Sequence, residues 1–270
     1  KKYLEGKKLG MIFQKSSTRT RVSFEAGMYE LGGHALFLSA NDLQIGRGEP
    51  IQDTARVLSR YLDGIMIRTY EQEEVEALAR YGSIPVINWL TDFEHPCQVL
   101  ADLMTIREFK GSLEGLKICY IGDGNNMANS LIAGAVKTKM NISIACPKGY
   151  EPDADIMKWA ADNSNFICTT DILKAAKDAD VLYTDVWASM GQESEAQIRK
   201  SVFKSFQIND DVVAVAKPDV MVLHCLPAHR NEEITDKVFE EHAKEIFEQA
   251  ENRLHVQKAV MVLLMKDDDA

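Results

Sequence analysis

The chain has 270 residues, a mass of 30.3 kDa and a formal net charge of −10 at pH 7. This length exceeds one average domain, so we expect two domains of moderate size. The acidic balance argues against nucleic acid or an anionic membrane surface as the main partner, and no apolar run is long enough to cross a bilayer. The negative net charge does not exclude a small anionic substrate, because the charge of the residues around a binding site decides whether such a substrate binds.

Cysteine usage and the first residues of the chain indicate a cytoplasmic protein. The N-terminal residues lack the apolar stretch of a secretory signal, and no Arg/Ser-rich transit segment follows. The cysteines are Cys97, Cys119, Cys146, Cys168 and Cys225. Because they are odd in number and lie mostly in apolar runs, we expect reduced thiols and no disulfide framework.

Short apolar runs alternate with helical patterns along the whole chain, which is typical of βα units and of parallel sheets covered by helices. In the first part we expect strands at residues 9–13, 35–38, 64–68 and 84–88 and helices at 20–31, 50–62 and 71–81. In the second part we expect strands at 117–121, 141–145, 181–184 and 220–224, separated by helices of ordinary length. The predicted fold class is α/β.

A domain boundary is expected after the helical pattern at residues 97–109, because Lys110-Gly111-Ser112 ends that pattern. We therefore predict two doubly wound domains, residues 1–110 and residues 111–241. The final helical pattern, at residues 242–265, is expected to pack back on the first domain.

The segment Ser16-Ser17-Thr18-Arg19-Thr20-Arg21 lies between a predicted strand and a predicted helix. Its hydroxyls, its arginines and the free N–H groups of the helix start converge on one point, which makes an anion site. The alternative is an ordinary N-cap with exposed arginines. Arg68 and the segment that begins at His95 favour the anion site over the ordinary N-cap.

Arg68 ends a strand of the same predicted sheet, and His95-Pro96-Cys97-Gln98 follows the next strand. Ligands of open α/β sheets bind at the carboxyl edge, where these residues are expected to meet. Alone, such an arginine could be solvated and such a histidine could be packed or capping. Together they predict a cationic pocket with neutral donors.

In the second half, Gly122-Asp123-Gly124-Asn125-Asn126 follows a strand in the manner of a dinucleotide fingerprint. Met127 stands where the third glycine should be, and no acidic residue occupies the ribose position. We interpret this segment as a loop for a polar substrate. Two later strand ends add Asp185, which could hold an ammonium group or cap a helix, and Cys225, which could be buried filler.

Four motifs taken together resemble the aspartate/ornithine carbamoyltransferase family over essentially the whole chain. They are STRTR (Ser17 to Arg21), HPCQ (His95 to Gln98), DVWASMG (Asp185 to Gly191) and HCLPAHR (His224 to Arg230), in the family's order and rough spacing. The Ser189-Met190-Gly191 loop and HCLP in place of HPLP are similar to the ornithine-specific branch. The resemblance therefore implies transfer of a carbamoyl group from carbamoyl phosphate to L-ornithine, giving L-citrulline and phosphate, in arginine metabolism. It suggests arginine biosynthesis, but the same site could also run in the catabolic direction.

The resemblance also implies residue roles. Carbamoyl phosphate would be bound by Ser17, Thr18, Arg19, Thr20, Arg68, His95, Gln98, Cys225, Leu226 and Arg253, with Gln44 from a neighbouring subunit. Ornithine would be bound by Asn126, Asp185, Ser189 and Met190. Catalytic roles would fall to Arg68, His95, Asp185, Cys225 and Arg253, without metal, cofactor or covalent intermediate. Closure of the two domains and of the SMG loop would exclude water.

A homotrimer with active sites at subunit interfaces is a further implication. Family members also carry helical sequence before the first strand, which would pack with the last helix, whereas Lys1 here comes almost directly before that strand. Other classes compatible with parts of the sequence are an NAD-dependent dehydrogenase, a non-catalytic relative that binds phosphate ligands, and a transferase acting on putrescine or an acylated ornithine.

Overall fold

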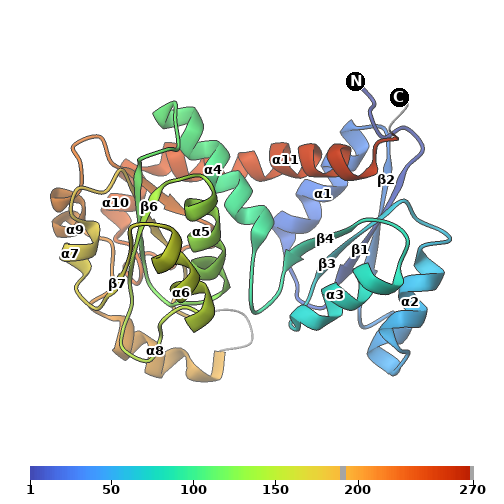
Figure 1. Cartoon of the computed structure of the whole chain (residues 1–270), viewed down its shortest axis with the longest axis horizontal. Helices are drawn as coiled ribbons and strands as arrows, with labels where there is room; N and C mark the ends of the chain where they lie inside the picture. Colours follow the sequence, from blue (N-terminus) through green and yellow to red (C-terminus); the bar gives the residue numbers. More distant parts are fainter. Residues whose placement is uncertain (189–192, 268–270) are drawn as a thin grey trace. The chain divides into compact units, whose positions relative to one another are not determined.

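The computed structural model describes residues 1–188 and 193–267 and consists of two compact units (Figure 1). Unit 1 comprises Lys1–Gln98 and Arg253–Ala270, and unit 2 comprises Val99–Asn252. Each unit holds one parallel sheet with helices on both faces, so the predicted α/β class is confirmed. Among the described residues, no helix has both the length and the apolar character needed to cross a membrane.

Unit 1 is built on four parallel strands in the order β2-β1-β3-β4. The strands are β1 (Lys8–Phe13), β2 (His34–Ser39), β3 (Gly64–Arg68) and β4 (Val86–Leu90). The connecting helices are α1 (Thr18–Glu30), the 3-10 helix η1 (Gln44–Arg47), α2 (Ile51–Leu58) and α3 (Gln72–Tyr81). The fourth strand starts two residues later than predicted, since Pro85 has no N–H to donate to the sheet.

Each face of the first sheet has its own apolar core. On one face, Phe24 and Met28 of α1 and Met261 of the C-terminal helix pack against Met11 and Trp89. On the other face, α2 and α3 cover side chains such as Ile65 and Ile67 of β3. The predicted packing of the C-terminal helix on this unit is thereby explained, because its apolar side chains complete the first of these cores.

Unit 2 is built on five parallel strands in the order β7-β6-β5-β8-β9. The strands are β5 (Lys117–Ile121), β6 (Asn141–Ala145), β7 (Phe166–Thr169), β8 (Val181–Thr184) and β9 (Met221–His224). The helices are α4 (Pro96–Lys110), α5 (Asn126–Lys137), α6 (Ala154–Asn163), α7 (Ile172–Ala176), the 3-10 helix η2 (Glu193–Glu195), α8 (Ala196–Phe203), α9 (Asp210–Val215), α10 (Asp236–Glu241) and α11 (Ala243–Met265).

The second sheet is also buried on both faces. Helices α4, α5 and α6 cover the face that presents Tyr120 and Tyr183, and α7 to α11 cover the face that presents Ile121 and Leu182. The limits of the two units fall inside α4 and α11, so no flexible linker marks either one. The two compact units do not test the predicted limits of the functional domains. Those limits, residues 1–110 with 242–265 and residues 111–241, stay a prediction.

The two glycines of the loop after β5 have a structural explanation that needs no dinucleotide. A Cβ atom on Gly124 would lie 2.2 Å from the backbone nitrogen of Pro152 and 2.5 Å from the carbonyl oxygen of Tyr150. Gly122 has a φ of +150°, which side chains disfavour. The glycines let two backbone segments approach closely, and the Gly124 N–H donates to Tyr150 O at 2.8 Å.

Replacing Gly124 by alanine should lower the free energy of unfolding by about 2–3 kcal/mol or more, because backbone atoms cannot give way as side chains do. Urea denaturation followed by circular dichroism measures this change. Gly27→Ala is the matched control: its Cβ would meet only side-chain atoms, the nearest 3.1 Å away, and alanine favours the α1 helix. Equal losses in the two variants would contradict this account of the loop.

Candidate functional site

The N-terminus of α1 is built as a polar cradle. Ser17 caps the helix, since its side chain accepts the Thr20 N–H at 3.3 Å. The hydroxyl oxygens of Ser17 and Thr20 lie 2.7 Å apart, and Arg253 Nη2 donates to the Thr20 hydroxyl at 3.0 Å. Thr18 and Arg19 of the first turn are exposed. The helix start thus presents free N–H groups, two hydroxyls and cationic side chains to one place.

Arg68 is a buried cation at the carboxyl end of β3, with 9% of its surface exposed. Among the described residues it has no ion pair, and its Nε has no hydrogen-bond partner. Burial, with a further contribution from the charge of Arg19, lowers the pKa of Arg68 to about 10. The guanidinium therefore stays charged at neutral pH. A buried charge without a counter-ion is costly, so this position favours a bound anion.

His95 is buried and neutral at physiological pH. Burial holds its pKa well below the ordinary value, and the nearby charges of Arg253 and Arg68 add to the effect. A neutral imidazole in this place can donate or accept one hydrogen bond without adding charge. The residue is therefore suited to polarise a carbonyl group, as a partner of the two arginines.

Trp89 joins the pocket residues together and was not anticipated from the sequence. It is fully buried, its ring centroid lies 5.1 Å from that of His95 and 5.2 Å from that of Phe24, and the Arg253 guanidinium lies 4.6 Å from it. A β-bulge explains its position, since Ile67 pairs with Asn88 and Arg68 pairs with Leu90. The ring fixes both the guanidinium and the imidazole by direct contact.

The two predicted glutamines differ in environment. Gln98 is 1% exposed and lies in the first turn of α4, three residues after His95. Gln44 begins η1 and is exposed, and its side chain makes no hydrogen bond to another described residue. The structure of a single chain therefore leaves Gln44 apart from the other predicted residues of unit 1.

In unit 2, Asp185 is the centre of a hydrogen-bond network at the carboxyl end of β8. Its Oδ1 accepts from Cys225 Sγ at 3.0 Å and from the Val186 N–H at 2.8 Å, and its Oδ2 accepts from Asn125 Nδ2 at 3.3 Å. Asn125 is also the N-cap of α5. Residues from three separate strand ends thereby hold one carboxylate at 7% exposure.

Cys225 is a neutral donor in this network. Burial, together with the neighbouring Asp185 carboxylate, raises the pKa of the Cys225 thiol well above its ordinary value. The thiol is therefore protonated at neutral pH and does not act as a thiolate nucleophile. Leu226 follows it with a φ of +60°, an unfavourable conformation for a branched residue.

A buried His224–Glu233 pair supports that conformation. His224 Nδ1 accepts the Leu226 N–H at 2.9 Å, so Nε2 carries the proton and donates to Glu233 Oε1 at 2.9 Å. Glu233 also accepts the His229 N–H at 2.6 Å. The turn that carries Cys225 and Leu226 is thus fixed by hydrogen bonds to groups that have almost no exposed surface.

Besides Asp185, three other residues were predicted to bind ornithine, and the structure describes the position of one of them. Asn126 is the first residue of α5, beside the Asn125 that contacts Asp185. Ser189 and Met190 lie outside the described residues, as does the rest of the predicted loop. Asn125 was part of the loop interpreted as binding a polar substrate, but its contact with Asp185 and its role as the N-cap of α5 were not predicted.

Arg199 supports the same region and was also missed. Its Nη1 donates to Asp123 Oδ2 at 2.7 Å and to Trp187 O at 3.1 Å, with both charged side chains buried. It thus ties the loop after β5 to the segment that follows β8. The sequence gives no signal for this pairing, because 76 residues separate the partners.

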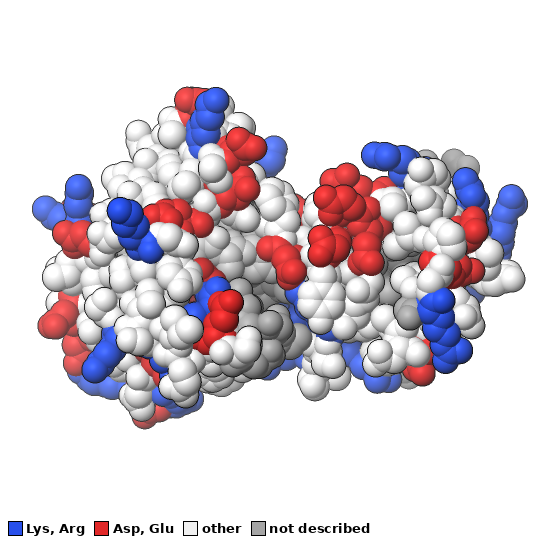
Figure 2. All heavy atoms as spheres, turned by 90° about the horizontal axis from the view of Figure 1, so that it is seen from below, with Lys and Arg blue, Asp and Glu red and all other residues white. Residues whose placement is uncertain are grey.

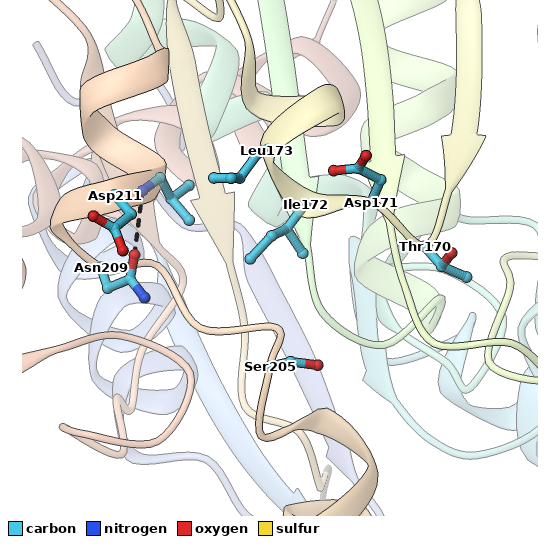
Figure 3. Close-up of a pocket in the computed structure, with 8 residues that line it drawn as sticks. Thr170, Asp171, Ile172, Leu173, Ser205, Asn209 and Asp211 are labelled. Atoms are coloured by element: carbon cyan, nitrogen blue, oxygen red, sulfur yellow. Dashed lines mark hydrogen bonds between the residues drawn. The ribbon is translucent and has the colours of Figure 1, made fainter.

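Two further ligand-like features among the described residues of unit 2 involve none of the predicted binding residues. A pocket of about 320 Å³ lies between the starts of α7 and α9 and is lined by polar caps such as Asp171 and Asn209 (Figure 3). His229, Glu232 and Glu233 could approach one metal ion, with ligand atoms within 4.8 Å of one another. Glu232, however, pairs with Lys200 at 2.6 Å and Glu233 holds His224, so both carboxylates already have partners.

Surface charge does not reveal the cationic pocket. On the face drawn in Figure 2, acidic side chains gather in one dense group and basic ones are dispersed. Arg68 and Arg253 are 9% and 5% exposed, so their charges are covered by other atoms. A net charge of −10 is therefore compatible with binding of a small anion.

Family models match both parts of the chain. Residues 1–108 match the carbamoyl-P binding domain of aspartate/ornithine carbamoyltransferase, and residues 114–264 match its Asp/Orn binding domain. Ornithine carbamoyltransferases from Thermococcus kodakarensis and Anoxybacillus flavithermus are 58% and 60% identical over 267 residues, which is 97% of this chain and 85% of each relative.

Solved structures agree with these matches. Ornithine carbamoyltransferase from Pyrococcus furiosus has a TM-score of 0.93 at 57% identity, covering 98% of this chain and 86% of that one. The anabolic enzyme from Campylobacter jejuni has a TM-score of 0.93 at 45% identity, covering 97% and 89%. Matched in both units by the domains of one family, the chain belongs to the aspartate/ornithine carbamoyltransferases.

Proposed function

We propose that the chain transfers the carbamoyl group of carbamoyl phosphate to the side-chain amine of L-ornithine, giving L-citrulline and phosphate in arginine biosynthesis. The observation that carries this proposal is the charge of Arg68, buried without an ion-pair partner among the described residues, near the open helix N-terminus of α1. The names of the relatives, including two that are called anabolic, support the substrates and the direction.

Unit 1 is assigned to carbamoyl phosphate. Ser17, Thr18, Arg19 and Thr20 bind the phosphate through hydroxyls, backbone N–H groups and charge, with Gln98 as a further ligand. Arg68, His95 and Arg253, with Thr20, surround the carbamoyl oxygen. Each well-placed donor of such an oxyanion site stabilises the transition state by roughly 3 kcal/mol. Departing phosphate remains at the helix N-terminus, where its charge is balanced.

Unit 2 is assigned to ornithine. Asp185 binds the side-chain ammonium, and Asn126, Ser189 and Met190 bind the rest of the amino acid. The Cys225 donor holds one Asp185 oxygen in place, and Cys225 and Leu226 line the reacting amine and carbonyl. Because burial keeps the Cys225 thiol protonated, the anionic group for the ammonium is Asp185. Catalysis then rests on positioning and electrostatics, without covalent, metal or cofactor chemistry.

The assembly and location are part of the same proposal. We assign the chain to a cytoplasmic homotrimer in which Gln44 completes the phosphate site of a neighbouring subunit. The exposure of Gln44 and its lack of a hydrogen-bond partner among the described residues support this role. The functional domains are residues 1–110 with 242–265 and residues 111–241, which bind carbamoyl phosphate and ornithine respectively.

The direct test is a citrulline-formation assay with carbamoyl phosphate and one of four amines. Ornithine, putrescine, aspartate and acetylornithine are compared at equal concentrations. We expect carbamoylation of ornithine alone, because Asp185 is proposed to bind the side-chain ammonium, which aspartate lacks, and Asn126, Ser189 and Met190 to bind the free α-amino acid end, which putrescine and acetylornithine lack. Preferential carbamoylation of another amine would refute the assignment of ornithine while leaving carbamoyl transfer intact.

Replacing Arg68 by methionine should lower kcat/KM for carbamoyl phosphate by about 100-fold to 1000-fold, the usual cost of losing one oxyanion donor. The same change should leave the melting temperature equal or raise it, because it removes a buried charge that has no partner. Steady-state kinetics and calorimetry measure the two effects. The exposed Arg80→Met is the control and should change neither; an Arg68→Met enzyme with full activity would refute the role.

Replacing Cys225 by alanine should raise the KM for ornithine by about tenfold, the expected loss for one hydrogen bond to a charged group. The KM for carbamoyl phosphate should change much less. Cys225→Ser keeps a donor for Asp185 and should recover most of the ornithine affinity. An ornithine KM that is the same in the alanine variant and the original enzyme would contradict this role of the thiol.

The neutral His95 should make the protein lose stability in mild acid. Below a pH of about 6.5 the unfolded imidazole takes up a proton that the folded one resists, so the free energy of unfolding falls as pH decreases. The slope reaches at most about 1.4 kcal/mol per pH unit and ends at the folded pKa. Urea titrations at pH 8 to 5 should show a shallower fall for His95→Gln; parallel curves would contradict burial of a neutral imidazole.

A further inference from the structure

Cys146 and Cys168 form a close pair of thiols in unit 2, outside the network of Asp185. Their sulfur atoms lie 3.8 Å apart. Cys146 directly follows β6, and Cys168 lies within β7, the strand at the edge of the sheet. Both pack against the same apolar core. The fold thus brings together two nucleophilic side chains that are 22 residues apart in the sequence.

The two thiols are not equivalent. Cys146 is 1% exposed, whereas Cys168 is partly exposed on the edge strand. Contact with the Cys146 thiol lowers the pKa of Cys168, although partial burial of Cys168 opposes this effect. Cys168 is therefore the sulfur that a peroxide can reach, with a second thiol beside it.

The buried cysteines elsewhere in the chain lack this arrangement. Burial raises the pKa of Cys97 to about 12 and that of Cys119 to about 11. Neither makes a hydrogen bond to another thiol among the described residues. Cys97 and Cys119 therefore serve as controls within the same chain for a reaction that is specific to Cys146 and Cys168.

We propose that Cys146 and Cys168 are an oxidation site at which a hydroperoxide converts the two thiols into a disulfide. Cys168 sulfur attacks the peroxide, the O–O bond breaks, and an alcohol or water leaves as Cys168 becomes a sulfenic acid. Cys146 sulfur then attacks that sulfur, loses its proton and releases water. Two thiols give up two electrons, which reduce one peroxide bond.

The reaction changes the local backbone. The sulfur atoms must close from 3.8 Å to the ~2.05 Å of a disulfide. The residue before Cys146 is Ala145, whose carbonyl accepts the Gly122 N–H at 3.0 Å. Gly122 begins the loop that carries Asn125, the partner of Asp185. Oxidation is thus expected to disturb the ornithine-binding loop, a consequence that rests on the proposed function.

The full chain is treated with hydrogen peroxide, denatured, alkylated to block free thiols and digested with trypsin. Mass spectrometry should find residues 140–148 joined to residues 159–174, at the summed peptide mass less two hydrogens, and dithiothreitol should separate them. Cys97 and Cys119 should remain alkylated. Recovery of Cys146 and Cys168 only as separate peptides, alkylated or over-oxidised, would overturn the proposal.

Single variants identify the attacking sulfur. In Cys146→Ser, a sulfenic acid should persist at Cys168 and be trapped by dimedone, because no second thiol can displace it. In Cys168→Ser, Cys146 should be recovered alkylated. Dimedone labelling of Cys146 in the latter variant, at a rate equal to that of Cys168 in the former, would overturn the assignment of Cys168 as nucleophile.

Kinetics then test the link to the ornithine loop. In protein shown by mass to be cross-linked, the ornithine KM should rise by about tenfold, since small displacements of substrate-positioning groups can cost up to ~100-fold. The same peroxide treatment of Cys146→Ser should leave that KM unchanged. An unaltered KM in cross-linked protein would refute the link alone, and absence of all activity before oxidation would refute the proposed function instead.

Discussion

The buried positive charge of unit 1 is the constraint on which the site depends. Arg68 and Arg253 are placed at 9% and 5% exposure, and Arg68 has no ion pair among the described residues. Such a charge is costly, so the position favours a bound anion. Burial lowers the pKa of His95, and the charges of Arg253 and Arg68 lower it further, so the same arrangement that favours an anion also keeps this imidazole uncharged.

Unit 2 has the same type of fold as unit 1, but it holds a buried negative charge where unit 1 holds buried positive charges. It holds the Asp185 carboxylate at 7% exposure, and this carboxylate forms no ion pair with another described residue, since the buried Arg199 pairs with Asp123 instead. Neutral donors, the Cys225 thiol and the Asn125 amide, orient Asp185 while leaving its negative charge available. In both units the functional side chains come from the carboxyl ends of parallel strands, where loops are free to carry polar groups because the sheet below is fully packed.

The sequence predicts those features that depend on local pattern. Strand ends locate Arg68, His95 and Asp185, and Ser17 follows from capping chemistry. Residues that act through tertiary packing give no such signal: Trp89 lies in a β-bulge just beyond the strand expected at residues 84–88, and Arg199 meets Asp123 across 76 residues. β7 was missed for a related reason, since a strand of four residues at a sheet edge, three half-buried and Ile167 exposed, is too short for a clear pattern.

Cys225 and His95 are both held in their uncharged forms. Burial raises the pKa of Cys225 and lowers that of His95, which favours the uncharged form of each. Both groups can then orient a reactant by hydrogen bonding without being consumed. The Cys146–Cys168 pair differs because one thiol stabilises charge on the other and the edge strand leaves it accessible. Burial thus shields lone thiols such as Cys97 and Cys119, whereas the proposed oxidation site combines a second thiol with partial exposure at a sheet edge.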